Sequence, residues 1–187
     1  MKKLLILALA CAATAAPALS AQERGWVAGV EYEQSNFEGP GSQNRGEYYS
    51  MGIKLGAAYN LPLPVKGLFV RPKATVNVRW GNLDDKWLGS YLCKYQSFGL
   101  GVNAFAGYRI FKYLEFFTGP TVDWYFYNHL DNDALRLNNG STYAYWTFGL
   151  GVPVGPVTIE GTYRQHLNTP ETDLERNRWS VGVTYRF

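Results

Sequence analysis

The stretch LFVRPKATVNVRW (68–80) alternates between two kinds of side chain and indicates how the chain folds. One set is mainly apolar and comprises Val70, Pro72, Ala74, Val76, Val78 and Trp80. The other set is mainly polar or basic and comprises Phe69, Arg71, Lys73, Thr75, Asn77 and Arg79. Because successive side chains of a strand point to opposite faces, the stretch predicts a β-strand with one apolar and one charged face.

Seven further segments show the same two-residue period. They span 25–34, 48–59, 96–109, 114–127, 142–154, 157–166 and 178–187. Each is about as long as the roughly 9–11 residues that a strand needs to cross a bilayer. Eight strands is an even number, as single-chain bacterial outer-membrane barrels have. The sequence therefore predicts an all-β fold, an eight-stranded antiparallel up-and-down transmembrane β-barrel over residues 22–187.

A soluble β-sandwich is the competing fold, and two features disfavour it. Aromatic residues gather near strand ends, as in the girdles of a membrane barrel: Trp26, Tyr59, Trp80, Tyr108, Trp124, Trp146, Tyr163, Trp179 and Tyr185. The polar face also carries many ionised groups, which a dry sandwich core would not tolerate. An aqueous or ion-paired lumen accommodates such groups.

The predicted connections alternate in length. Those at 60–67, 110–113 and 155–156 are short, whereas those at 35–47, 81–95, 128–141 and 167–177 are longer and polar. Outer-membrane barrels have short periplasmic turns and long external loops. We therefore expect both termini to lie on the periplasmic side.

The inward faces are predicted to carry thirteen charged residues that form an ion-pair network in the lumen. The basic members are Lys54, Arg71, Lys73, Arg79, Arg109, Arg164, Arg178 and Arg186, and the acidic members are Glu31, Glu33, Glu115, Asp123 and Glu160. Strand adjacency places Glu31 and Glu33 near Lys54 and near Arg178 or Arg186. It also places Glu115 and Asp123 across from Arg109. Buried charges persist when they are paired and hydrogen-bonded.

Glycine occupies the middle of an apolar-Gly-apolar triplet in every second strand. The four are Gly52, Gly101, Gly151 and Gly182, all on the inward face. The interior of an eight-stranded barrel is only wide enough for side chains to fill it, so these glycines leave room for the large inward groups. Pro120 removes a ladder hydrogen bond within a strand and predicts a bulge or a local gap in pairing.

Residues 1–21 predict an export signal. Lys2 and Lys3 precede an apolar run over 4–16 and small residues at 16–21, where signal peptidase would cut after Ala21. An alternative, lipid attachment at Cys11, rests on a weak motif. Without the signal, 16 basic and 15 acidic residues remain, which gives no footprint for nucleic acid. Cys93 would then be the one remaining cysteine, so no intrachain disulfide is expected.

The ending RWSVGVTYRF (178–187) resembles the C-terminal assembly signal of bacterial outer-membrane proteins. Its outward residues are Trp179, Val181, Val183, Tyr185 and Phe187. The segments YLEFFTGPTVDWYF (113–126) and FGLGV (98–102 and 148–152) are similar to those of small OmpX-like, OmpA-barrel and porin-family proteins. The resemblance covers the predicted mature chain. It implies a Gram-negative outer-membrane location, recognition by the barrel-assembly machinery, and contact with outer-membrane lipid and lipopolysaccharide, but it hardly specifies function.

No motif in the sequence predicts catalysis, a metal site or a cofactor. His166 lacks the serine that barrel deacylases place nearby, so lipid A modification is a remote alternative. Asp131, Asn132 and Asp133 offer oxygen ligands but not the spacing of a calcium loop. Two functions remain open: a non-enzymatic structural or surface-interaction barrel with a side-chain-filled lumen, and a narrow pore that its positive lumen would bias toward anions.

Overall fold

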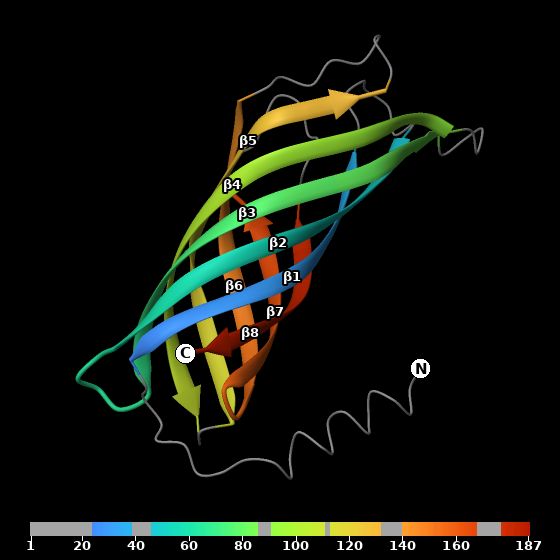
Figure 1. Cartoon of the computed structure of the whole chain (residues 1–187). Coiled ribbons are helices and arrows are strands. Elements are labelled where there is room, and N and C mark those ends of the chain that lie inside the picture. Colours follow the sequence, from blue (N-terminus) through green and yellow to red (C-terminus); the bar gives the residue numbers. More distant parts are fainter. Residues whose placement is uncertain (1–23, 39–45, 86–90, 111–112, 132–139, 168–176) are drawn as a thin grey trace, which may run out of the picture.

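A computed structural model of the chain shows a single closed antiparallel barrel (Figure 1). The structure describes residues 24–38, 46–85, 91–110, 113–131, 140–167 and 177–187, without the side chains of 35–38, 46–49, 82–85, 91–93 and 130. The eight strands are β1 (Gly25–Glu38), β2 (Gly46–Pro62), β3 (Leu68–Asp85), β4 (Tyr91–Ile110), β5 (Leu114–Leu130), β6 (Ser141–Val154), β7 (Val157–His166) and β8 (Arg178–Arg186). The predicted fold class and strand count are confirmed.

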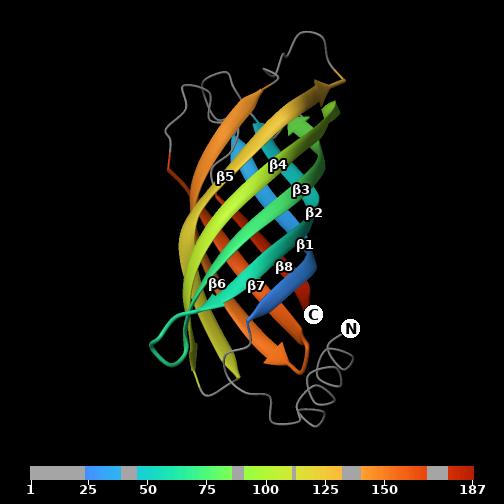
Figure 2. The same cartoon turned by 60° about the vertical axis from the view of Figure 1, so that its left-hand side comes forward.

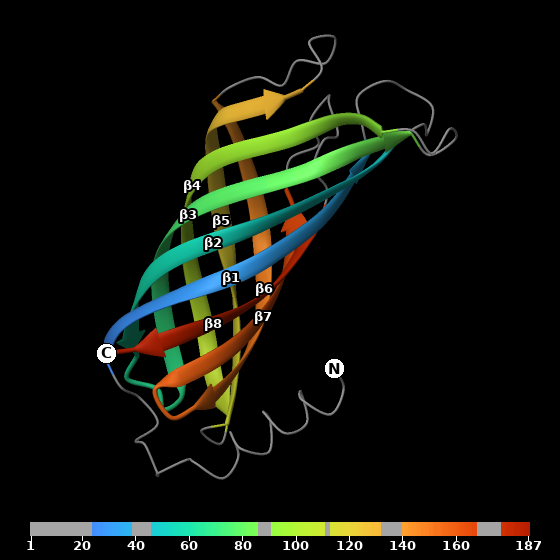
Figure 3. The ribbon, with the colours of Figure 1, turned by 45° about the vertical axis from the view of Figure 1, so that its right-hand side comes forward.

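Each strand pairs with its neighbours in chain order, and β8 pairs with β1 to close the barrel (Figure 3). Closure satisfies the backbone of every strand without leaving a sheet edge in hydrocarbon. The predicted signal segment 1–21, including Cys11, lies outside the described residues. No helix in the described part of the chain is long and apolar enough to span a membrane.

β1 to β6 are longer than the sequence pattern predicts, mostly at one end of the barrel, whereas β7 has the predicted bounds and β8 ends one residue earlier. β4 has 20 residues and β3 has 18, whereas β8 has 9. The short connections between β2 and β3, β4 and β5, and β6 and β7 share the other end, which we call the turn end (Figure 2). At the end opposite the turn end, β1 to β5 continue past the residues where β6 and β8 begin.

The two prolines interrupt the hydrogen-bonded ladders locally. Pro120 of β5 is paired with Trp146 of β6, but Gly119 and Pro120 have no partners in the β4–β5 register. Pro72 is paired with β4 and lacks a partner in the β2–β3 register. The gap predicted at Pro120 is therefore present, while the bulge in β5 lies at Phe126, opposite Phe98 and Gly99. The missing proline N–H accounts for both gaps.

The two faces of the wall differ as the alternation predicts. Leu55, Leu100, Leu150 and Val181 point outward and are each about half exposed. Inward residues are buried, and most of the buried set is polar or charged. The wall therefore turns its apolar face outward, as a barrel surrounded by lipid requires, and keeps its polar groups inside.

Candidate functional site

The candidate site is the lumen, which is polar and buried and contains a network of ion pairs. Eleven of the thirteen predicted charged side chains are buried, and only Arg109 and Arg186 keep about a tenth of their side-chain surface exposed. The network has a central cluster and a turn-end cluster. We describe each in turn.

The central cluster consists of Glu33, Lys54, Asp123, Arg164 and Arg178, which come from five different strands. Lys54 Nζ lies 2.8 Å from Asp123 Oδ2 and 3.0 Å from Glu33 Oε2. Arg178 Nη1 lies 3.1 Å from Glu33 Oε1 and 3.2 Å from Asp123 Oδ2. Arg164 Nη1 lies 3.0 Å from Glu33 Oε2 and 3.5 Å from Asp123 Oδ2. Arg79 Nε lies 3.6 Å from Glu33 Oε1, so the two carboxylates contact four cations in all.

The turn-end cluster consists of Arg71, Arg109, Glu115, Glu160 and Arg186. Arg71 donates from Nη1 to Glu160 Oε1 and from Nη2 to Glu115 Oε2, both at 2.7 Å. Arg109 pairs with Glu115, and Arg186 Nη2 lies 3.8 Å from Glu115 Oε1. Since β3 and β7 are four strands apart in either direction around the barrel, the Arg71–Glu160 pair crosses its full width.

Glu31 and Lys73 connect the two clusters. Lys73 pairs with Glu31 and lies 4.0 Å from Glu160 Oε2 in the turn-end cluster. Glu31 Oε2 in turn lies 3.2 Å from Arg164 Nη2 in the central cluster. The ion pairs therefore form one continuous network rather than isolated bridges, which satisfies the requirement that buried charges be paired.

Aromatic rings cover the network on both sides. Arg178 Cζ lies 4.7 Å from the Tyr145 ring centroid, and Arg178 Nη1 donates to the Tyr125 hydroxyl at 2.8 Å. Arg79 Cζ lies 5.5 Å from the Tyr125 centroid. Such distances are within the range of cation–π attraction. Both tyrosines are fully buried, so they exclude water beside the central cluster.

Toward the turn end, Phe69, Phe105 and Phe117 form a buried apolar cluster. The Phe105 and Phe117 centroids are 5.1 Å apart, and Arg71 Cζ lies 4.8 Å from the Phe69 centroid. Inward glycines make room for these rings, because a Cβ at Gly149 would overlap the ring of Phe117. The lumen is thus packed on either side of its charges.

One expected pairing differs in the structure. Asp123 does not lie across from Arg109 but pairs with Lys54, Arg164 and Arg178. Of the two arginines expected near Glu31 and Glu33, Arg178 pairs with Glu33, and Arg186 approaches Glu115 instead. The long side chains reach over the barrel interior, which strand adjacency alone does not predict.

Two contributors to the network lie outside the predicted strands. Asn60 was assigned to a connection, yet it is buried and its Oδ1 accepts from Arg71 Nε at 2.6 Å. Tyr95 was also placed in a connection, yet it is buried with Arg79 Cζ 5.9 Å from its ring centroid. Continuing the two-residue period by one step beyond each predicted strand would have found both residues.

Both histidines pack against tyrosine rings. His166 packs against Tyr145, with ring centroids 5.2 Å apart, and its backbone N–H donates to Asn177 Oδ1 at 3.4 Å. His129 stacks on Tyr127. Among the described residues, no group of three or more His, Cys, Asp or Glu could hold a metal ion. Asn132, Asp133 and the side chain of Cys93 lie outside the description.

The sequence of residues 4–187 matches the family described as "Outer membrane protein beta-barrel domain". The chain belongs to this family. This confirms the resemblance inferred from the sequence, and it identifies an outer-membrane β-barrel protein whose lumen is polar and buried. Comparison with curated protein sequences finds no match.

Solved outer-membrane barrels share the fold at low sequence identity. Ail, the attachment invasion locus protein of Yersinia pestis, solved in complex with the heparin analogue sucrose octasulfate, superposes with a TM-score of 0.56 at 17% identity, covering 89% of this chain and all of Ail. Neisserial surface protein A of Neisseria superposes with a TM-score of 0.50 at 11% identity, covering 87% of this chain and 97% of that one. At these identities the likeness concerns the outer-membrane barrel fold alone.

Proposed function

We propose that the protein is a non-enzymatic outer-membrane barrel whose lumen is closed by its own ion pairs and whose long connections serve surface interaction. The observation that carries this proposal is the Arg71–Glu160 pair, which joins opposite strands at 2.7 Å. A wall-to-wall contact of this kind is expected to obstruct passage along the barrel axis at that level. The central cluster and the buried Tyr125 and Tyr145 close a second level.

The proposed orientation has the turn end and both termini in the periplasm. It is supported by the alternation of short and long connections, which is typical of outer-membrane barrels. In this orientation β1 to β5, which continue past the start of β6 and β8, would form a raised sheet on the outside. That sheet would support the connections that face the surroundings of the cell.

A narrow pore is the second candidate function, and the charge of the lumen favours it. The thirteen charged residues comprise eight cations and five anions, and an excess of positive charge would bias conduction toward anions. A closed barrel and a pore predict different ionic currents across a planar bilayer.

In planar bilayers we expect the wild-type barrel to show no steady conductance, because both lumen levels are closed. Arg71→Ala removes the contact between opposite strands and is expected to produce brief, irregular openings. Thr142→Ala, at an exposed position on β6, is the matched control and should behave as wild type. Steady, reproducible wild-type conductance whose size changes in Arg71→Ala would show that the barrel is a pore.

We also propose that the outward residues of β8, together with Phe187 directly after it, are the assembly signal. Trp179, Val181, Val183, Tyr185 and Phe187 all lie on the outer face and are between 45% and 76% exposed. Because Phe187 is the most exposed of the five, its loss should leave the packing of the barrel almost unchanged.

Deleting Phe187 is therefore expected to lower the amount of protein inserted into the outer membrane about tenfold while purified protein still refolds in detergent. The readout is the fraction that migrates faster on gels when it is not boiled, compared between outer membranes and refolded material. Exposed Tyr113→Ala is the control for loss of an aromatic side chain at the barrel end. Normal insertion without Phe187 would contradict the assignment.

A further inference from the structure

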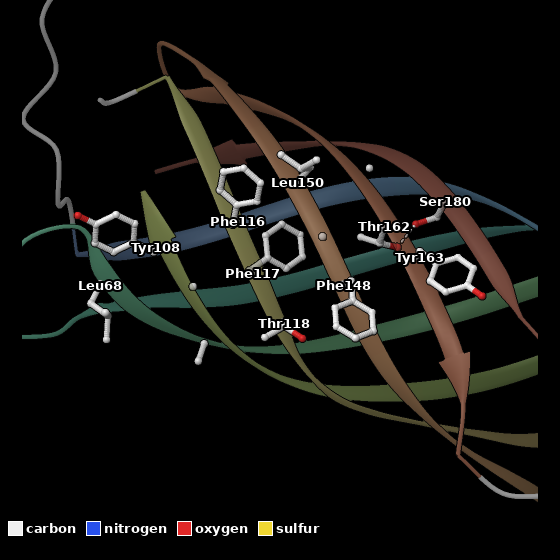
Figure 4. Close-up of a pocket in the computed structure, with 14 residues that line it drawn as sticks. Leu68, Tyr108, Phe116, Phe117, Thr118, Phe148, Leu150, Thr162, Tyr163 and Ser180 are labelled. Carbon is white, nitrogen blue, oxygen red and sulfur yellow. Dashed lines mark hydrogen bonds between the residues drawn. The ribbon is translucent and has the colours of Figure 1, made fainter. Parts of the chain in front are cut away.

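The outer wall carries a hollow of about 770 Å³ that spans β4 to β7 and touches β8 (Figure 4). Its sides are the outward side chains of Tyr108, Phe116, Phe148, Leu150 and Tyr163. Nearly all of its lining is apolar. The hollow is a shallow depression that is open to the surroundings of the barrel.

At the hollow, small outward residues lie between large ones. In the register of the strands, Ala106 is opposite Thr118, and Gly161 is opposite Leu150. A Cβ added at Gly161 would meet nothing closer than Ser180 O at 4.0 Å. This differs from inward glycines such as Gly182, where a Cβ would lie 2.6 Å from Glu31 Cγ. Glycine at position 161 is thus not required by packing, and its effect is to leave space.

What fills this space is set by its surroundings. The hollow is continuous with the outward apolar face, which in an outer-membrane barrel contacts hydrocarbon. Thr118 is a small outward residue of the hollow that carries a hydroxyl. Its Oγ1 accepts a hydrogen bond from Trp146 Nε1 and donates one to Thr147 O, both at 2.8 Å, so this hydroxyl is already bonded. No charged side chain lines the hollow among the described residues. The chemistry that fits is an unbranched hydrocarbon chain.

We propose that this hollow is a binding site for an acyl chain of a phospholipid, held between Phe116, Phe148 and Tyr163 with Gly161 at its base. Leu68, at the start of β3, and Tyr108, near the end of β4, place the site toward the turn end. With the orientation under Proposed function, on which the choice of lipid rests, that half of the wall faces the periplasmic leaflet. The occupant is therefore a phospholipid rather than lipopolysaccharide.

The test compares lipid retention by variants that fill the hollow or leave it open. Full-length protein is purified from outer membranes in a mild detergent, and bound lipids are counted by native mass spectrometry. Gly161→Phe places a ring in the hollow. Gly161→Leu places a smaller side chain there and serves as the test if Gly161→Phe does not fold. Ala57→Phe adds the same bulk to an exposed outward position on β2, outside the hollow.

We expect about one phospholipid per wild-type barrel, an equal amount in Ala57→Phe, and at least a fivefold loss in both Gly161 variants. Equal retention in all four proteins would overturn the site. Retention of lipopolysaccharide in place of phospholipid would overturn the choice of lipid and the orientation together. A wild-type dimer that Gly161→Phe converts to monomer would show that a second copy fills the hollow. None of these results bears on conductance, so the lumen proposal is tested separately.

Discussion

Asp123→Ala is expected to lower the free energy of unfolding by about 3–5 kcal/mol, because removing one partner of a buried ion pair leaves its counter-charges uncompensated. Asp123 has no exposed surface and touches three cations, Lys54, Arg164 and Arg178. Glu33 would remain beside these three cations, with Glu31 contacting Arg164 only from the edge of the cluster. Urea unfolding in lipid vesicles, followed by tryptophan fluorescence, measures the change.

The control for this substitution is Asp131→Ala, which removes an aspartate that is exposed at the end of β5. It should leave the unfolding midpoint unchanged. Asp123→Asn keeps the shape and the Asn77 Nδ2 contact at 3.1 Å but loses the charge, so its loss of stability should lie between those of the other two variants. An Asp123→Ala barrel as stable as wild type would show that the central cluster does not hold the lumen together.

Gly101→Val is expected to cost at least about 1–3 kcal/mol, the usual range for overpacking a filled interior. A Cβ at Gly101 would overlap Asp123 Oδ1 and Thr75 Oγ1 and would lie 3.1 Å from Asn77 Nδ2. Asp123 cannot move away without breaking its ion pairs. The added side chain therefore displaces the central cluster as well as filling space.

Gly161→Val is the matched control, since it makes the same chemical change at an outward glycine with open space around it. It should be neutral or slightly stabilising, because valine favours a strand more than glycine does. Both variants are compared by urea unfolding and by the fraction that refolds into vesicles. Equal stability of Gly101→Val and Gly161→Val would mean that the lumen has spare volume.

The sequence was sufficient to predict the barrel because the two-residue period is imposed by hydrocarbon on one side of the wall. The prediction of strand ends fails beyond the membrane, where hydrocarbon no longer imposes the two-residue period. The residues from Gly81 to Asp85 continue β3, and those from Tyr91 to Tyr95 begin β4. Their hydrogen-bonded ladder runs on although the apolar alternation has stopped. Strand ends beyond the membrane therefore carry no comparable signal.

The sequence predicts which charged residues face the lumen, but not which of them form ion pairs with each other. Arg109 and Glu115 are register partners, so strand adjacency was enough to pair them. Glu31 and Lys54 are register partners as well, yet Lys54 bonds to Glu33 and Asp123. In a barrel this narrow, a lysine or arginine reaches strands far from its own. The choice of partner depends on barrel tilt and on how side chains pack, which the sequence pattern does not contain.

The position of the ion-pair partners along the chain has a consequence for the order of folding. Glu33 is on the first strand, and its partners Arg164 and Arg178 follow it by 131 and 145 positions. Contacts between residues so distant in sequence form slowly, because the chain entropy lost in closing the loop precedes the gain. β8 must therefore pair with β1 before Arg178 can contact the carboxylate of Glu33. Closing the barrel and forming this ion pair are one event. Until that event, Glu33 can pair with Lys54 of the adjacent strand β2, while Arg164 and Arg178 lack Glu33 as a partner and the wall is unsealed.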